Sequence, residues 1–450
     1  MNKIQRLCIV LVFSFGAFGQ EENRFIFEKP NQRSTKVNFI SLNNLMIIPV
    51  EINGVATNFL VDTGISKTLL FSFNQPNLLN TENLKRIKVK GFGGDENLYA
   101  YQSKGNQIKM KGLINDDAEL YLFFNEDYNL SKKLGINISG IIGYELFKDF
   151  VVRINYQKRQ LKFYQPQRFN RALRRFQKKE IQFHKEKPYI NVFSTDEVVQ
   201  KDSIKLLVDT GSSDALWLIE NEYIKLKEPN FSDILGYGFI GLIEGKRSKL
   251  DQLNLGKYQF ADLNIAYPDE LSFSFLEEVK NRDGSIGAEL MRRFTWFIDY
   301  PNESLYFKAN SNYDDDFIYD MSGLVLKYEG FDYIQKTVSQ AIYVNSDSNY
   351  QSDSKTDQRA LNVRIEIVER LKIAAIRPNS PAYYLGLRPN DIILEINKKP
   401  AYQKNLEQIT KILSSGHNDL VKLKIQRGEK IFEIQLILQD RLKVLDEENK

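Results

Sequence analysis

The chain has 450 residues, with 62 Lys and Arg against 58 Asp and Glu, a formal net charge of +4. So small an excess does not favour nucleic acid as a partner. One cysteine and two histidines argue against thiol nucleophiles, disulfide frameworks, iron–sulfur clusters and zinc sites. We therefore expect no metal and no organic cofactor, and chemistry that comes mainly from carboxylates.

The N-terminal residues have the pattern of a signal peptide. The segment 1–19 reads MNKIQRLCIVLVFSFGAFG, with two basic residues, an apolar run and then small residues before Gln20. The run is too short to span a membrane, and no other segment approaches the roughly 18 apolar residues that a spanning helix needs. We predict an exported protein, periplasmic or secreted, with no stable membrane span after cleavage. An uncleaved interfacial anchor is the alternative.

The rest of the chain has the pattern of a mainly β protein. Short runs rich in Val, Ile, Phe and Tyr alternate with Gly, Asn, Asp and Lys. Helical periodicity is sparse. The best helical candidates are Arg171 to Glu180, Ser274 to Lys280 and Leu406 to Ser414.

An internal repeat is the strongest organisational signal. The hexapeptide FLVDTG at 59–64 recurs as LLVDTG at 206–211, and a second block at 143–163 recurs at 287–307. Two blocks that recur in the same order at nearly the same offset indicate two related lobes. We place the lobes at 20–167 and 181–316. A basic connector, 168–180, joins them and is interpreted as a solvated helix rather than a polyanion site.

Each repeat places one aspartate directly after an apolar run. A single Asp-Thr-Gly is most simply a turn in which Asp bonds its own backbone. Two copies at the same position of two lobes predict that Asp62 and Asp209 meet across a pseudo-twofold axis. Two carboxyls in contact share one proton, so one acts as an acid and the other as a base. Such a pair can activate water for amide hydrolysis without a metal.

These motifs resemble the aspartic peptidases of the retropepsin and pepsin superfamily. The resemblance covers roughly Phe39 to Lys308, and it includes the sequence DTGSS at 209–213 and apolar-Gly motifs at 141–143 and 285–287. It implies a two-lobed acid-protease β-barrel fold with Asp62 and Asp209 as the catalytic residues. The residues that it implies as support for this pair are Thr63, Gly64, Thr210, Gly211 and Ser212.

The family also closes a glycine-containing hairpin flap over its substrate. The candidates are Gly93 and Gly94 in the first lobe and Tyr237 and Gly238 in the second, with ordinary surface turns as the alternative. One departure concerns the position three residues after each aspartate, which holds Ser212 in the second lobe but Ile65 in the first. Because only a serine hydroxyl can donate a hydrogen bond, we expect Asp62 to carry the shared proton and Asp209 to be the base.

The C-terminal part resembles a bacterial PDZ domain. From residue 372 it reads KIAAIRPNSPAYYLGLRPNDIILEINKKP, which carries most of the signature of that family. The resemblance implies a PDZ β-barrel with flanking helices over 317–440, with a polar insertion at 345–359 and a tail at 441–450. Gly323 and Leu324 are then the candidates for binding a peptide C-terminus or extended segment, beside a helix at 406–413.

The sequence thus predicts an exported aspartic endopeptidase that acts on polypeptides, with a PDZ domain for peptide capture or regulation. The alternative is a catalytically weak or inactive peptide-binding scaffold of the same fold. Ile65 is the feature that keeps this alternative open.

Overall fold

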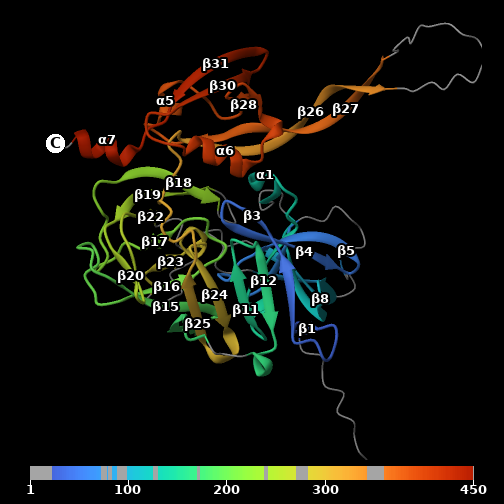
Figure 1. Cartoon of the computed structure of the whole chain (residues 1–450), viewed down its shortest axis with the longest axis vertical. Coiled ribbons are helices and arrows are strands. Elements are labelled where there is room, and N and C mark those ends of the chain that lie inside the picture. Colours follow the sequence, from blue (N-terminus) through green and yellow to red (C-terminus); the bar gives the residue numbers. More distant parts are fainter. Residues whose placement is uncertain are drawn as a thin grey trace, which may run out of the picture.

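The structure is a computed structural model that describes residues 23–71, 79, 84–88, 99–124, 130–169, 173–237, 242–269, 282–341 and 359–448. It consists of four β-sheets with few short helices, which confirms the predicted mainly β class (Figure 1). The predicted signal peptide lies outside the described residues. Within the described part of the chain, no helix is long and apolar enough to cross a membrane.

The first lobe is built on a nine-stranded sheet. Buried apolar residues of its central strands, such as Ile47 and Ile48, form the core of this lobe. In spatial order the strands are β1 (Ile26–Phe27), β9 (Leu113–Leu122), β6 (Thr68–Leu70), β10 (Gly140–Ile142), β5 (Val55–Val61), β4 (Leu45–Ile52), β8 (Tyr99–Met110) and β7 (Lys85–Lys88), with β3 (Ile40–Leu42) paired to β4.

The second lobe is built on a ten-stranded sheet of similar design. In spatial order its strands are β18 (Phe231–Tyr237), β19 (Leu242–Leu250), β22 (Leu263–Pro268), β17 (Leu216–Leu218), β23 (Gly284–Ile286), β16 (Ile204–Val208), β15 (Lys187–Ser194), β20 (Leu253–Leu255) and β21 (Tyr258–Phe260), with β14 (Gln182–His184) paired to β15.

The two lobes repeat one local arrangement around their central strands. β10 runs parallel to β5, with Ile142 opposite Val61, and β23 runs parallel to β16, with Ile286 opposite Val208. A one-turn helix follows in each lobe, α2 (Tyr144–Phe147) and α4 (Ala288–Met291). The sequence repeat is therefore matched by a repeat of parallel strand pairing, which is uncommon in a mainly antiparallel fold.

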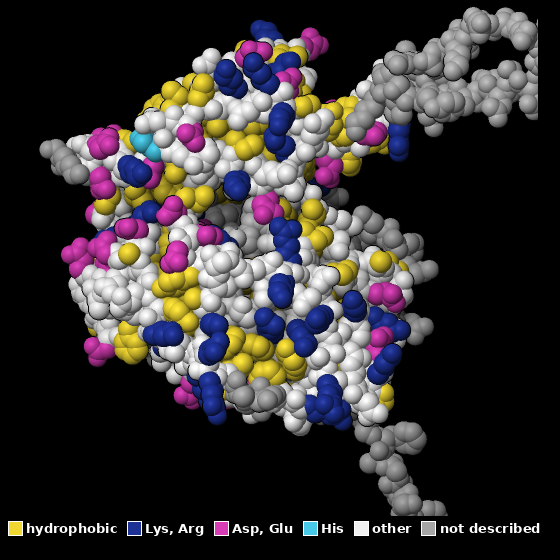
Figure 2. Space-filling view, viewed as in Figure 1, with side chains coloured by type: hydrophobic (Ala, Val, Ile, Leu, Met, Phe, Trp, Pro, Cys, Tyr) yellow, Lys and Arg dark blue, Asp and Glu magenta, His cyan; other side chains and the backbone are white. Residues whose placement is uncertain are grey.

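A six-stranded sheet joins the lobes through the antiparallel pair of β11 and β24. Cationic side chains lie over aromatic rings of this sheet, with Lys162 Nζ 4.5 Å from the ring centroid of Tyr164 and Arg153 Cζ 5.8 Å from that of Phe297. Figure 2 shows a group of hydrophobic side chains bordered by Lys and Arg on the lower part of the molecule. In spatial order the strands are β13 (Gln177–Glu180), β25 (Ser304–Ala309), β24 (Phe294–Asp299), β11 (Val151–Asn155), β12 (Gln160–Tyr164) and β2 (Ser34–Asn38), with turns η2 (Pro166–Arg168) and η3 (Tyr300–Asn302) nearby.

The connector between the lobes corrects one prediction. Its second half is not helical but forms strand β13, which pairs with β25 along the edge of the inter-lobe sheet. Because an unpaired strand edge offers the backbone a full set of hydrogen bonds, sheet pairing overrides the helical propensity of this lysine-rich segment. The helix predicted at 274–280 lies outside the described residues, whereas the one at 406–414 is present as α6 (Leu406–Leu413).

The C-terminal sheet lies above both lobes (Figure 1). Its first two strands form a long hairpin, and α6 packs against the sheet through Leu406, Ile409 and Leu413. The elements are β26 (Leu324–Ala341), β27 (Arg359–Ile376), β28 (Ile392–Ile396), β29 (Lys399–Pro400), β30 (Leu420–Arg427) and β31 (Lys430–Ile437), with α5 (Pro381–Tyr384), η4 (Ala401–Gln403) and α7 (Arg441–Glu448).

One apolar cluster runs continuously from the first lobe into the C-terminal sheet. It includes Leu42 and Leu45 of the lobe and Leu324 and Leu326 of β26. At this contact the helix α1 (Leu130–Leu134) ends at Gly135, where an added Cβ would lie 2.2 Å from the ring of Tyr328. The glycine is therefore required for the close approach of lobe and C-terminal sheet.

Candidate active site

Two aspartates sit at equivalent strand ends, one in each lobe. Asp62 follows β5 and Asp209 follows β16, and the preceding apolar residues of both strands are buried. The backbone N–H of Asp62 donates to Ile142 O and that of Asp209 donates to Ile286 O, each at 2.9 Å. The hydrogen bond to the neighbouring parallel strand thus fixes the position of each aspartate backbone at the end of its strand.

The structure brings the two carboxyl groups together. After burial, the nearby negative charge of Asp209 is the largest influence that raises the pKa of Asp62. The glycines of the two tripeptides make this contact possible, because a Cβ on Gly211 would lie 2.3 Å from Cγ of Asp62. A Cβ on Gly64 would lie 3.0 Å from Oδ1 of Asp62 and 3.2 Å from Oδ1 of Asp209. Any larger residue at either glycine would displace a carboxyl group.

Two buried threonines lock the lobes together behind the aspartates. Thr63 Oγ1 donates to Val208 O at 2.6 Å, and Thr210 Oγ1 donates to Val61 O at 2.9 Å. Each hydroxyl also accepts the backbone N–H of the other threonine at 3.1 Å. All four bonds cross between the lobes, so they hold the carboxyl groups at a fixed separation.

The electrostatics of the pair are not symmetrical. Asp62 Oδ1 accepts one backbone N–H, from Gly64 at 2.6 Å, whereas Asp209 Oδ1 accepts two, from Gly211 at 2.9 Å and Ser212 at 3.1 Å. Burial, followed by the negative charge of Asp209, raises the pKa of Asp62 well above its usual value. Asp62 therefore stays protonated at pH values where a solvated aspartate is ionised.

The source of this asymmetry differs in detail from the sequence argument. The hydroxyl of Ser212 was the expected donor, but the bond that the structure shows comes from its backbone N–H. In the first lobe the corresponding N–H, of Ile65, points to the carbonyl of Asp62 at 3.4 Å rather than to its carboxyl group. The backbone of the two loops, and not only the side chain, distinguishes the two aspartates.

Two tyrosines near the pair were missed as site residues. Burial raises the pKa of Tyr156, with a contribution from Asp209, and raises that of Tyr300 with a smaller contribution from Asp62. The charge of each aspartate thus affects the tyrosine of the opposite lobe. Neither tyrosine hydroxyl has a hydrogen-bond partner among the described residues. Tyr156 and Tyr300 occupy matching positions of the second repeated block, at 143–163 and 287–307. The sequence repeat therefore indicated that the two tyrosines are structurally equivalent.

Each lobe has a hairpin at the predicted flap position. These are β7 with β8 and β18 with β19. Gly93, Gly94 and Gly238 lie outside the described residues, and Tyr237 is the last residue of β18. A closing role of either hairpin stays a prediction.

The predicted carboxylate-binding loop already holds a carboxylate of this chain. Asp320 Oδ1 accepts the backbone N–H of Gly323 at 2.6 Å and of Ser322 at 3.1 Å, while Leu324 N–H donates to Ser322 Oγ at 3.0 Å. The N–H groups of Gly323 and Leu324 are therefore not free in this structure. Binding of a peptide C-terminus there stays a prediction, and it requires that these internal bonds be replaced.

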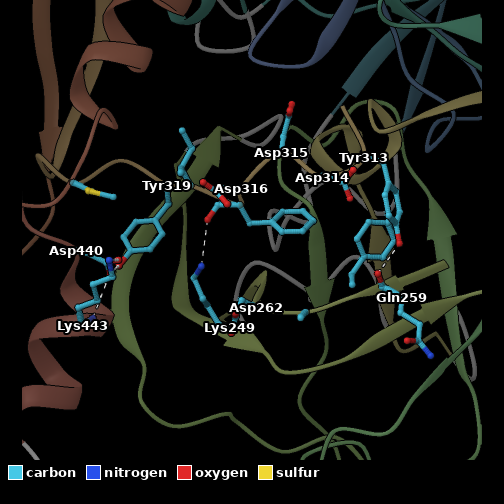
Figure 3. Close-up of a pocket in the computed structure, with 15 residues that line it drawn as sticks. Lys249, Gln259, Asp262, Tyr313, Asp314, Asp315, Asp316, Tyr319, Asp440 and Lys443 are labelled. Carbon is cyan, nitrogen blue, oxygen red and sulfur yellow. Dashed lines mark hydrogen bonds and ion pairs between the residues drawn. The ribbon is translucent and has the colours of Figure 1, made fainter. Parts of the chain in front are cut away.

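A pocket of about 490 Å³ lies away from the aspartates, where the second lobe meets the segment 313–319 and α7 (Figure 3). Its lining includes Asp314, Asp315 and Asp316 but neither Asp62 nor Asp209. Among the described residues, no group of three or more His, Cys, Asp and Glu side chains is placed to hold a metal ion.

Two family models and one curated protein match parts of this chain. Residues 48–146 match the aspartyl protease family model, and residues 372–427 match the PDZ domain model. The first match contains Asp62, whereas Asp209 lies beyond it. The chain also matches the periplasmic serine endoprotease DegP of Salmonella typhimurium strain LT2, with 32% identity over 108 residues. That match spans 22% of this chain and 22% of DegP.

Proposed function

We propose that this chain, which carries an aspartyl protease domain and a PDZ domain, is an aspartic endopeptidase that hydrolyses polypeptides. The observation that carries the proposal is the contact between Asp62 and Asp209, in which the pKa of Asp62 is raised by burial and by its partner. A pair that holds one proton supplies an acid and a base at the same place, which is what hydrolysis of an amide by water requires.

In the proposed mechanism the two aspartates have different roles. Asp209, whose carboxylate accepts two backbone N–H groups, takes a proton from a water molecule held between the pair. Asp62, which is protonated, donates its proton to the carbonyl oxygen of the scissile peptide bond. The water oxygen bonds to the carbonyl carbon in the same step. Asp209 then gives the proton that it took from water to the peptide nitrogen, the C–N bond breaks with its electron pair on the departing amine, and Asp62 takes back a hydroxyl proton as the new carboxyl group forms.

Export is part of the proposal. It is supported by the basic and apolar leader at residues 1–19. N-terminal sequencing of the mature protein tests it, with Gln20 as the expected first residue.

Digestion of a mixed peptide pool tests the proposed activity. Purified protein spanning 20–450 is incubated with the pool between pH 4 and pH 7, and new peptide termini are identified by mass spectrometry. We expect internal cleavages that persist after treatment with a serine-directed fluorophosphonate, because no serine is proposed as a nucleophile. Absence of cleavage under every condition would favour the peptide-binding scaffold, and inhibition by the fluorophosphonate would favour a serine peptidase.

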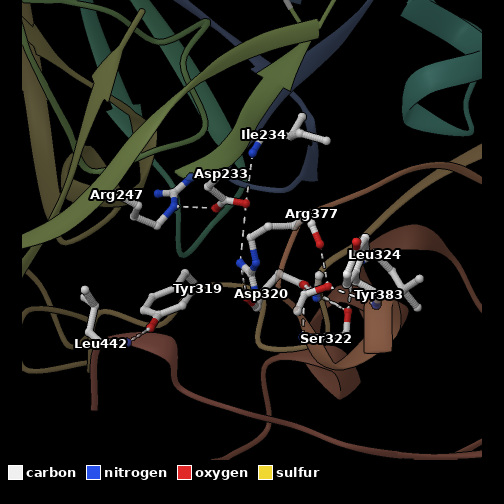
Figure 4. Close-up of polar contacts among 12 residues, drawn as sticks. Asp233, Ile234, Arg247, Tyr319, Asp320, Ser322, Leu324, Arg377, Tyr383 and Leu442 are labelled. Atoms are coloured by element: carbon white, nitrogen blue, oxygen red, sulfur yellow. Dashed lines mark hydrogen bonds and ion pairs between the residues drawn. The ribbon is translucent and has the colours of Figure 1, made fainter. Parts of the chain in front are cut away.

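For the PDZ domain we propose regulation of the cleft, supported by a chain of buried contacts (Figure 4). Arg377 Nη1 donates to Asp320 O at 3.1 Å and to Asp233 Oδ1, on the hairpin strand β18, at 3.4 Å. The guanidinium also lies over the ring of Phe231, 4.9 Å from its centroid. The loop that holds Asp320 is thereby joined directly to the hairpin at the flap position.

The chain of contacts continues to the loop that carries Asp209. Asp233 Oδ2 accepts from Arg247 Nε at 2.8 Å, and Arg247 Nη1 donates to Asp214 Oδ1 at 3.2 Å. Asp214 lies five residues after Asp209. A ligand that displaced Asp320 from its loop would disturb Arg377, and so would change the restraint on both the hairpin and this loop.

Arg377→Met is expected to weaken this coupling. Removal of the guanidinium leaves Asp233 with Arg247 as its remaining cationic partner among the described residues. We expect faster amide hydrogen exchange in β18 and β19 and a KM for peptides raised roughly 2- to 30-fold. Arg370→Met, which removes an ion pair with Asp332 on the outer hairpin of the same domain, is the control. Equal exchange and KM in both variants would contradict the coupling.

A further inference from the structure

The two lobes differ at one hairpin beside the aspartates. In each lobe a two-residue turn precedes the strand that pairs with the Asp-bearing strand. Both residues of each turn have positive φ: 47° at Asn43 and 66° at Asn44 in the first lobe, and 48° at Lys185 and 66° at Glu186 in the second. In the first lobe the turn is flanked by the pair Leu42 and Leu45. In the second lobe the equivalent pair is His184 and Lys187.

The register of the sheet runs toward Lys187 and the aspartate of the same lobe. Tyr189 of β15 lies opposite Leu207 of β16 in the last pair of this ladder. Lys187 comes two residues before Tyr189 and Asp209 two residues after Leu207, so the same antiparallel register, continued past the ladder, brings the two residues opposite each other. Residues at directly opposed positions of antiparallel strands have Cβ atoms about 5 Å apart. In the first lobe the last pair of the equivalent ladder is Ile47 with Leu60. The same continuation of the register there brings Leu45 opposite Asp62.

The hairpin also reaches the opposite lobe. Glu186 Oε2 lies 3.7 Å from Nζ of Lys67, which is five residues after Asp62. Burial lowers the pKa of Lys187 below its usual value. The negative charges of Asp62 and Asp209 act in the opposite direction and offset part of this shift. Lys187 is therefore held where the loops of the two aspartates converge, whereas Leu45 is 7% exposed and packs in the apolar cluster of the first lobe.

The cationic and polar groups here make few direct bonds to the protein. Lys187 feels the charge of Asp62 and Asp209 but forms no ion pair among the described residues. The buried Nε2 of His184 has no hydrogen-bond partner in the same part of the chain. Arg282, which acts electrostatically on Lys187 and Asp209, is 9% exposed and donates through Nε to the carbonyl of Gly284 at 3.2 Å. Partly buried cations without anionic partners are costly unless a ligand supplies the anion.

We infer that Lys187 forms a subsite for a peptide carboxylate close to the scissile bond, with His184 as a second polar contact, so that acidic peptides are preferred. The inference rests on the proposed function. The carboxylate can belong to an Asp or Glu side chain or to the end of the peptide, since both present the same group to an ammonium.

Matched peptides test the subsite. Each has blocked ends and carries Glu or Gln at one position, from the third residue before the scissile bond to the third after it. We expect wild-type kcat/KM to favour Glu over Gln by roughly tenfold at one position, and Lys187→Met to lose this preference. Lys187→Glu is expected to favour Lys at that position. Lys185→Met, which removes the exposed lysine of the same turn, is expected to keep the wild-type preference.

A second peptide series, with free or amidated C-termini, distinguishes the two sources of the carboxylate. A preference for Glu over Gln that is unchanged in Lys187→Met would overturn the subsite. Binding of the same peptides to Asp209→Asn, followed by fluorescence anisotropy, needs no turnover. If no peptide is cleaved, the proposed function fails. The ratio of the affinities for Glu and Gln peptides still tests the subsite in that case, because equal affinities would overturn the subsite.

Discussion

Asp209→Asn is expected to abolish peptide cleavage while the fold is retained. Loss of a general base typically lowers the rate by roughly 10² to 10⁴. An asparagine keeps Oδ1, so it can still accept the backbone N–H groups of Gly211 and Ser212 that hold the aspartate. The measurement is kcat/KM for a peptide cleaved by the wild type, together with thermal unfolding of both proteins.

The pH dependence of stability gives this variant a second readout. Because the pKa of Asp62 is raised in the folded state, the folded protein holds its proton more tightly than the unfolded chain. The associated stability is present below the unfolded pKa, near 4, and is lost as pH rises through the folded pKa. Asp209→Asn removes the negative charge that contributes to this shift, so its melting temperature should fall less steeply with rising pH.

Asp62→Asn is the matched variant for the proposed division of roles. It is also expected to be inactive, because it cannot supply the shared proton. Retention of more than a tenth of wild-type activity in either variant would exclude a two-aspartate mechanism. A pH dependence of stability that is the same in Asp209→Asn and wild type would show that Asp209 does not set the pKa of Asp62.

The sequence was sufficient for the central geometry because the repeat encoded it twice. The apolar runs before Asp62 and Asp209 predicted strand ends. The apolar-glycine motifs at 141–143 and 285–287 were noted as part of the resemblance, and the structure adds that they end strands parallel to the Asp-bearing ones. Duplication alone implied that equivalent residues meet at the axis. The contact of Asp62 with Asp209 therefore followed from local patterns and one symmetry argument.

Features that depend on register or on long-range contacts were not accessible in this way. Lys187 looks like an ordinary turn residue until the pairing of Tyr189 with Leu207 shows that the register leads toward Asp209. The occupation of the PDZ loop by Asp320 was missed because a carboxylate three residues from Gly323 has no pattern of its own. The segment ending at Glu180 was predicted to be helical because the free edge of β25 is not visible in the sequence.

Thr210→Val is expected to give the largest loss of stability among substitutions that conserve shape. Valine matches threonine in volume but leaves the N–H of Thr63 and the carbonyl of Val61 without their partner at the buried junction of the lobes. At about 1 to 3 kcal/mol for each of the two orphaned groups, we expect a loss of about 2 to 6 kcal/mol. Urea unfolding measures it, since the slope of the transition reports whether both lobes still unfold together.

Two further variants separate the hydroxyl from packing. Thr63→Val is expected to be destabilising to a similar degree, because its hydroxyl makes the reciprocal bonds to Val208 O and Thr210 N–H. Thr210→Ser keeps the hydroxyl and loses only a methyl group, so it should cost about 1 kcal/mol. If Thr210→Val unfolds within 1 kcal/mol of wild type while Thr210→Ser is the weaker protein, methyl packing rather than the crossed hydrogen bonds holds the aspartates together.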